Sequence, residues 1–164
     1  MLDGVIAQGH GIATAAGCQL AAACDLVVAE EGAQFATPGV QIGLFCTTPM
    51  VPLSRAVGRK KSLEMLLTGK FISAQEAKEY GLVNRVAPKT KLEEETWALA
   101  KNIDQYSLAI VTLDKQSFYQ QIEMAEKQAY QYAKEIISAN ALMDDVLEGM
   151  SAFLEKRPPV WKDK

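Results

Sequence analysis

The segment GHGIATAAGCQL, residues 9–20, combines small residues with one polar side chain in a way that could bind a polarised oxygen. The first backbone N–H groups of a helix have no partner within the helix, and they carry a partial positive charge. If a helix begins in this segment, Ala16 and Gly17 leave those N–H groups uncovered by side chains. The spacing therefore predicts a backbone oxyanion hole at Ala16 and Gly17, with Gln19 on the same helix.

Two other interpretations of these residues remain open. The small side chains could simply let a helix and a strand pack closely. Alternatively, Gly9-x-Gly11 after a strand, with Glu30 at the end of the next strand, is typical of a dinucleotide-binding turn. Thr14 stands where that motif needs its third glycine, and no further alternation of strands and helices completes the fold. The dinucleotide interpretation is therefore the weaker one.

Other reactive side chains are few. His10 is the only histidine, which excludes a multi-histidine site, and the three cysteines lack metal-ligand spacing, so no metal is expected. Cys18 lies near a helix start, which lowers a thiol pKa, but the alanines around it favour a small core residue. Thr14 and Thr37 could line a pocket, although threonines at turns commonly bond to the backbone.

Length and composition predict a globular protein of one ordinary domain. The chain has 164 residues, of which 49% are hydrophobic and 23% charged. The formal net charge of −3 gives no basic field for nucleic acid or anionic lipid, so we expect neither as a partner. No apolar run reaches membrane-spanning length and no targeting segment is recognisable in these residues.

The elements that must position these residues follow from hydrophobic periodicity and from caps. Strands at 5–8 and 25–30 around a helix at 14–25 predict a right-handed β-α-β unit, with a third strand at 33–38. Further along, we expect a helix beginning at Thr48–Pro49, a helix ending at Gly69, a capping box from Ser73 to Glu76, a strand at 82–88, and helices at 92–103, 107–121, 123–139 and 144–156.

Three blocks of the chain resemble the enoyl-CoA hydratase/isomerase (crotonase) family in the same order. They are HGIATAAGCQLAAACDLVVAEEGAQFATPGVQIGL, LSRAVGRKKSLEMLLTGKFISAQEAKEYGLVNRV and EGMSAFLEKRPPVW. The resemblance implies an α/β fold, with the C-terminal part of a crotonase-like β-β-α spiral at residues 1–88. It also implies a helical oligomerisation region at residues 89–164, and hence a homo-trimer or a dimer of trimers.

The resemblance also implies a ligand and its site. The substrate or ligand would be a coenzyme A thioester of fatty acid metabolism, with no separate cofactor, and the chemistry that of a lyase. The thioester carbonyl would lie between two backbone N–H groups, one of them in the turn at Ala16 and Gly17. Residues that match substrate-binding or CoA-binding positions are Thr14, Ala16, Thr37, Phe153 and Lys156, the last two reaching CoA on a neighbouring subunit.

Two departures from the family pattern matter for activity. Gln19 and Gly39 stand where hydratases carry two glutamates, and the following turn, LFCTTPM, is one residue shorter. Neither residue can transfer a proton near neutral pH. Family members also have several strands and helices before a segment like residues 5–8, so the other oxyanion N–H is expected outside these 164 residues.

The sequence therefore predicts an acyl-CoA-binding protein with little or no hydratase activity. A non-catalytic structural or regulatory subunit, and an active hydratase or isomerase that uses other groups, are the alternatives. The resemblance places such a protein in the cytoplasm of a bacterium or in the mitochondrial matrix of a eukaryote.

Overall fold

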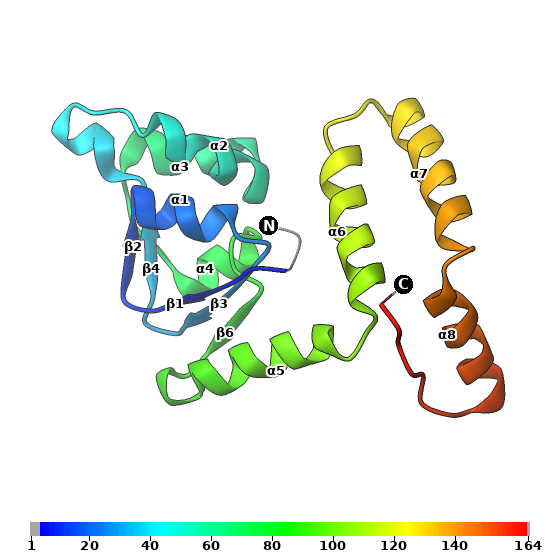
Figure 1. Ribbon diagram of the computed structural model, residues 1–164. Coiled ribbons are helices and arrows are strands. Elements are labelled where there is room, and N and C mark those ends of the chain that lie inside the picture. Colours follow the sequence, from blue (N-terminus) through cyan, green and yellow to red (C-terminus); the bar gives the residue numbers. More distant parts are fainter. Residues whose placement is uncertain (1–3, 164) are drawn as a thin grey trace. The chain divides into compact units, whose positions relative to one another are not determined.

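The computed structural model describes residues 4–163, which form two compact units (Figure 1). The first unit is Val5–Ala100, and the second is built from residue 101 onward together with Gly4. The division falls inside helix α5, Leu92–Asp104, whereas the helical region of the chain already begins after Pro88. Each unit is described by itself below.

The first unit contains two small sheets of three strands each. The first sheet has the order β1-β3-β6 and is parallel throughout, and the second has the order β2-β4-β5 with β4 and β5 antiparallel. The strands are β1 Ile6–Gly9, β2 Ile12–Thr14, β3 Leu26–Glu30, β4 Gln34–Ala36, β5 Ile72–Ser73 and β6 Arg85–Ala87. Because β1 and β3 are parallel and α1 lies between them in the chain, the predicted β-α-β unit is confirmed.

The helices of the first unit cover these strands. Helix α1, Ala16–Ala23, lies between the strands and helix α2, Thr47–Ala56 (Figure 1). The remaining helical segments are η1 Pro38–Ile42, α3 Arg59–Thr68, α4 Ala74–Glu79 and η2 Lys89–Lys91. The core between the layers is built mainly from buried aliphatic residues and Phe35, and it includes the thiols of Cys18 and Cys46.

Two predicted helix caps, the capping box at Ser73 and the glycine at the end of α3, are confirmed. Ser73 Oγ accepts a hydrogen bond from the N–H of Glu76 at 3.2 Å, and the Glu76 carboxylate accepts from the N–H of Ser73 at 2.8 Å. Both halves of the capping box at α4 are therefore formed. Gly69 ends α3 in the left-handed region with φ 62°, where glycine has no steric cost.

The structure differs from the sequence predictions in three local details. The helix expected from residue 14 begins at Ala16, because Ile12–Thr14 pairs with Gln34–Ala36 as a parallel ladder. Helix α2 has Cys46 rather than Thr48 at its N-cap, so Pro49 lies inside the first turn. The short strand β5 and the 3₁₀ helix η1 were not anticipated, since neither has enough residues to show a period.

The second unit is helical, as the periodicity predicted. Its helices are α6 Leu108–Gln121, α7 Glu126–Asn140 and α8 Asp144–Glu155, and α6 packs alongside α7 (Figure 1). The expected helices at 92–103, 107–121, 123–139 and 144–156 are confirmed within a few residues at each end.

Candidate functional site

The predicted oxyanion turn lies at the carboxyl ends of two parallel strands. Thr14 ends β2 opposite Ala36, which ends β4, and the N–H of Ala15 donates to the carbonyl of Ala36 at 3.0 Å. Helix α1 begins at the next residue, Ala16. The chain therefore passes from strand to helix through Ala15 alone, which sets the direction of the N–H groups that follow.

Ala15 is held in a conformation that L-residues avoid. Its φ of 46° and ψ of −110° are the mirror image of an extended conformation, a region that glycine occupies readily. Ala16 and Gly17 are exposed, and among the described residues no hydrogen bond outside the regular elements starts from either N–H. Strain of this kind persists where the surrounding structure imposes it, and it clusters at functional sites.

Replacing Ala15 with glycine is expected to stabilise the protein. The substitution relieves about 1–3 kcal/mol of backbone strain and costs about 0.4–1 kcal/mol of unfolded-state entropy. The net gain of about 1 kcal/mol should appear as a higher denaturant midpoint at an unchanged slope. Unchanged or lower stability of Ala15→Gly would show that the turn is not strained.

Gln19 belongs to the same face of α1 as the turn. It lies three residues after Ala16, so these two residues share one face of the helix. Its own N–H closes the first turn by donating to the carbonyl of Ala15 at 2.9 Å. A half-buried amide at this place can orient a polar group but cannot remove a proton from water.

The second missing carboxylate has no space in this chain. Gly39 is buried, and a Cβ atom at this position would lie 2.5 Å from the carbonyl oxygen of Leu44 and 2.8 Å from Sγ of Cys46. The N–H of Leu44 also donates to the carbonyl of Gly39 at 2.9 Å, which closes the segment on itself. The shortened turn 43–46 therefore fills the volume that a side chain at residue 39 would occupy.

The thiol of Cys18 is a protonated core group. The pKa of Cys18 is raised from 9.0 to about 11, mainly by burial and also by the nearby Cys46, while a hydrogen bond from the backbone of Ala36 lowers it in part. A thiol with so high a pKa is a poor nucleophile at neutral pH. The interpretation of Cys18 as a small core residue is therefore confirmed.

This raised pKa predicts a loss of stability in alkaline solution. Unfolded Cys18 loses its proton near pH 9, whereas folded Cys18 keeps it to about pH 11, so stability falls as the pH rises between these values. The shift corresponds to about 2–3 kcal/mol for this group. Urea unfolding of the unmodified chain and of Cys18→Ala across this range should show a smaller loss in the variant, and equal losses would contradict the assignment.

The contact between Glu30 and Gly11 accounts for the Gly9-x-Gly11 pair without a bound nucleotide. Its carboxylate is buried, and Oε1 accepts a hydrogen bond from the N–H of Gly11 at 2.9 Å. Gly9 ends β1 and Gly11 belongs to the turn before β2, so the pair joins two strands rather than opening a helix. The dinucleotide interpretation is therefore wrong.

The other predicted site residues lie in different surroundings. Thr14 is half-buried at the end of β2, but Thr37 is fully buried, and its hydroxyl has no hydrogen-bond partner among the described residues. Phe153 and Lys156 lie in the second unit at the C-terminal end of α8, where the phenyl ring is 82% exposed. The structure thus brings together Thr14, Ala16, Gly17 and Gln19, whereas Thr37 is buried away from the surface.

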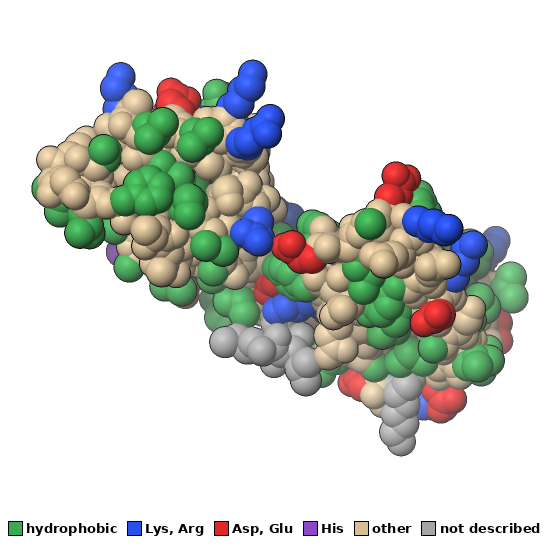
Figure 2. All heavy atoms as spheres, turned by 90° about the horizontal axis from the view of Figure 1, so that it is seen from above, with side chains coloured by type: hydrophobic (Ala, Val, Ile, Leu, Met, Phe, Trp, Pro, Cys, Tyr) green, Lys and Arg blue, Asp and Glu red, His purple; other side chains and the backbone are tan. Residues whose placement is uncertain are grey.

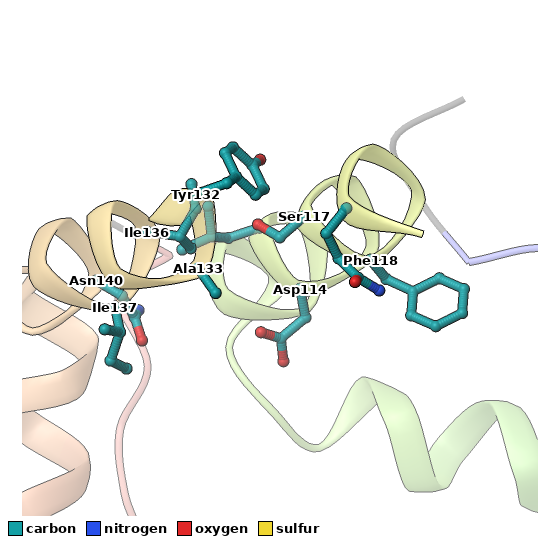
Figure 3. Close-up of a pocket in the computed structure, with 10 residues that line it drawn as sticks. Asp114, Ser117, Phe118, Tyr132, Ala133, Ile136, Ile137 and Asn140 are labelled. Carbon is teal, nitrogen blue, oxygen red and sulfur yellow. The ribbon is translucent and has the colours of Figure 1, made fainter. Parts of the chain in front are cut away.

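A shallow pocket of about 370 Å³ lies between α6 and α7 in the second unit. Ser117 points from α6 toward α7 among apolar side chains, while Asp114 and Asn140 lie toward the rim (Figure 3). The Ser117 hydroxyl has no hydrogen-bond partner among the described residues. Within residues 4–163, no group of three or more His, Cys, Asp or Glu could hold a metal ion, and no helix is long and apolar enough to cross a membrane.

Sequence reasoning missed the features that depend on contacts between distant residues. The strain at Ala15 and the packing of Leu44 and Cys46 against Gly39 follow from the second sheet and from the shortened turn. The one-residue shortening was a visible signal that this turn takes a different path. No comparable signal marked Asp145, which is buried on α8 and holds the C-terminal residues.

Comparison with known proteins identifies the relatives of this arrangement. Proteins named enoyl-CoA hydratase domain-containing protein 3, mitochondrial, from human and mouse are 50% and 49% identical over 157 residues, which cover 96% of this chain and 52% of each relative. Within the family, the blocks ATAAGCQL, FATPGV and GLFC of this chain predict a resemblance to this branch, and these relatives confirm it. The chain spans about half the length of these curated relatives.

Solved structures give the same result. An enoyl-CoA hydratase from Mycobacterium smegmatis superposes with a TM-score of 0.95 at 51% identity, and the human enoyl-CoA hydratase domain-containing protein 3 with 0.94 at 49%. Each match covers 98% of this chain, with 62% and 63% of the respective neighbour. These matches confirm the crotonase fold, and the enoyl-CoA hydratase/isomerase family model matches residues 3–164. The chain therefore belongs to the enoyl-CoA hydratase/isomerase family.

Proposed function

We propose that this chain binds an acyl-CoA thioester and holds its carbonyl oxygen at the N–H groups of Ala16 and Gly17. The observation that carries the proposal is the strained turn at Ala15, which starts α1 with exposed N–H groups and no covering side chain. A thioester oxygen is a hydrogen-bond acceptor that becomes more negative as its carbonyl is polarised. Backbone donors at a helix start stabilise such charge strongly.

The same site lacks the groups that hydration of an enoyl thioester requires. Hydration needs a base to activate water and an acid to protonate carbon. Gln19 supplies an amide, and Gly39 is packed against Leu44 and Cys46 with no room for a carboxylate. We therefore infer little or no hydratase activity in a protein that retains the recognition of its ligand.

The nucleotide end of CoA would bind at the end of α8. The exposed ring of Phe153 and the ammonium of Lys156 belong to residues three positions apart at one helix end. A ring can stack on a base, and a cation attracts a phosphate. These are the two chemical features of the nucleotide part of CoA.

We also propose that the chain assembles into a homo-trimer or a dimer of trimers. Large hydrophobic side chains gather at the surface of each unit (Figure 2). Exposed examples on the helices of the second unit are Tyr130, Ile137, Met150 and Leu154, and Leu142 is exposed in the turn between α7 and α8. Such extended apolar surface normally marks a protein interface. Light scattering at micromolar concentration should give an oligomer, and a monodisperse monomer would contradict this proposal.

A comparison of two ligands tests the binding proposal. Saturated acyl-CoA and the S-alkyl CoA thioether of equal chain length differ only in the carbonyl oxygen. At about 100 times its dissociation constant, the thioester should stabilise the protein by about 2.7 kcal/mol in a thermal-shift measurement. We expect the thioether to bind at least tenfold more weakly. Equal binding of both would contradict the oxyanion role, and an oligomer that binds neither would favour a non-catalytic structural subunit.

A further inference from the structure

The last residues of the chain are tied to α8 by a single buried carboxylate. Asp145, which is 1% exposed, accepts hydrogen bonds from the N–H of Lys162 at 2.7 Å and of Asp163 at 2.9 Å. The hydroxyl of Ser107, at the start of α6, donates to the same carboxylate at 2.5 Å. One side chain thus joins the beginning of α8, the beginning of α6 and the end of the chain.

A second carboxylate holds the part of this segment nearest to α8. Glu148 receives two hydrogen bonds from the guanidinium of Arg157, at 2.5 and 3.0 Å, and one from the N–H of Val160 at 2.8 Å. The hydrogen bonds from Arg157 are the main cause that lowers the pKa of Glu148 to about 2, so this contact persists in mild acid. Paired hydrogen bonds of this kind fix direction as well as distance.

Trp161 completes the attachment. A Cβ atom added to Gly149 would lie 3.3 Å from the indole ring, so the ring lies directly against the backbone of α8 at this glycine. Its Nε1–H donates to the carbonyl of Gln105 at 2.8 Å. Residues 157–163, which we call the C-terminal strap, are thus fixed along their length on the helices of the second unit.

The strap begins immediately after a strained lysine. Lys156 ends α8 with φ 56° and ψ 39°, a left-handed conformation in which glycine would cost less. The next N–H, of Arg157, donates to the carbonyl of Ala152 at 3.0 Å and so closes the helix end. The strap, which begins at this N–H, is what holds the backbone of Lys156 in place.

We propose that the C-terminal strap positions Lys156 and Phe153 for the nucleotide part of CoA, with Asp145 and Glu148 as positioning residues. This inference rests on the proposed binding of an acyl-CoA. The strap fixes the last turn of α8, so that the ammonium and the phenyl ring are presented together. A freed strap leaves both side chains in the protein but lets their separation vary, which raises the entropy lost when the nucleotide binds.

The test distinguishes binding of the nucleotide part of the ligand from binding of its thioester part. Dissociation constants for acyl-CoA and for acyl-pantetheine, which lacks the nucleotide, are measured by calorimetry on the unmodified chain, on Asp145→Asn and on Asp144→Asn. We expect Asp145→Asn to weaken acyl-CoA about tenfold and to leave acyl-pantetheine unchanged. The neighbouring Asp144 is exposed, so its variant should change neither constant. Trp161→Phe removes the hydrogen bond to Gln105 and the part of the ring that lies against Gly149, and it should give a smaller loss in the same direction.

The outcomes distinguish the two proposals. Tighter binding of acyl-CoA than of acyl-pantetheine, lost in Asp145→Asn, supports the strap. Unchanged acyl-CoA affinity in a folded Asp145→Asn, or an equal loss for both ligands, overturns it while thioester binding stands. Absence of binding to either ligand by the unmodified chain overturns the proposed function and the inference with it. Should Asp145→Asn not fold, the same comparison in Trp161→Phe decides.

Discussion

Hydration of a short enoyl-CoA by the purified chain is expected to stay close to the uncatalysed rate. Each positioned proton-transfer group contributes about 10²–10⁴ in rate, and this site has neither. Gln19 offers an amide in place of one carboxylate, and Gly39 offers no side chain in place of the other. Because groups that act together are not additive, we expect a deficit of about 10⁴-fold relative to a relative that carries both glutamates.

Loss of the conjugated enoyl absorbance measures this directly. The matched variants are Gln19→Glu, which restores one carboxylate on α1, and the double variant that adds Gly39→Glu. Gln19→Glu should remain close to background, because one group cannot supply both proton transfers. Robust turnover by the unmodified chain, abolished by no substitution at Gln19, would show that other groups carry out the chemistry.

Gly39→Ala is expected to destabilise the protein by about 1–3 kcal/mol, because its new methyl group would overlap a backbone carbonyl. The Cβ position is 2.5 Å from the oxygen of Leu44, and a backbone atom cannot move aside as a flexible side chain can. Gly17→Ala is the matched control. Its Cβ would lie 3.9 Å from the Cβ of Ala13, so the same substitution should stabilise α1 by up to about 1 kcal/mol.

Denaturant unfolding of these two variants should therefore give shifts of opposite sign. Gly39→Glu should be less stable still, since it buries a carboxylate in the same space. Restoring the family's glutamate at this position is thus expected to damage the fold before it restores chemistry. Equal stability of Gly39→Ala and the unmodified chain would mean that the turn at Leu44 moves freely and that the site has room for a carboxylate.

Local sequence signals predicted most of the fold. The capping box at Ser73 and the glycine that ends α3 are decided by residues within one helical turn of each other. The long helices after Pro88 have enough residues to show their period. The start of α1 near Ala16 and the buried character of Cys18 followed in the same way from neighbouring small residues.

The chemistry of the site depends on contacts between residues far apart in the chain, which local sequence patterns do not predict. Ala15 takes its positive φ where β2 pairs with β4, and the paired residues are 22 positions apart in the chain. Gly39 is confined because the turn at Leu44 folds back onto it. In the sequence, Asp145 looks like an ordinary acidic residue in the first turn of a helix. It becomes a buried hydrogen-bond acceptor only because α8, the start of α6 and the C-terminal strap pack together. Pairing and packing of this kind override what single residues indicate.

Amide chemical shifts of Ala16 and Gly17 test the central claim most directly. An ¹⁵N-labelled sample is titrated with saturated acyl-CoA and, in parallel, with free CoA, which lacks the acyl group and its thioester carbonyl. A new hydrogen bond to the thioester oxygen should move the amide proton of Ala16, and of Gly17 where it shares the bond, downfield in a saturable way with acyl-CoA alone. If acyl-CoA binds while both amide signals stay in place, or if free CoA moves them equally, the thioester oxygen is not held at this turn and the account is contradicted.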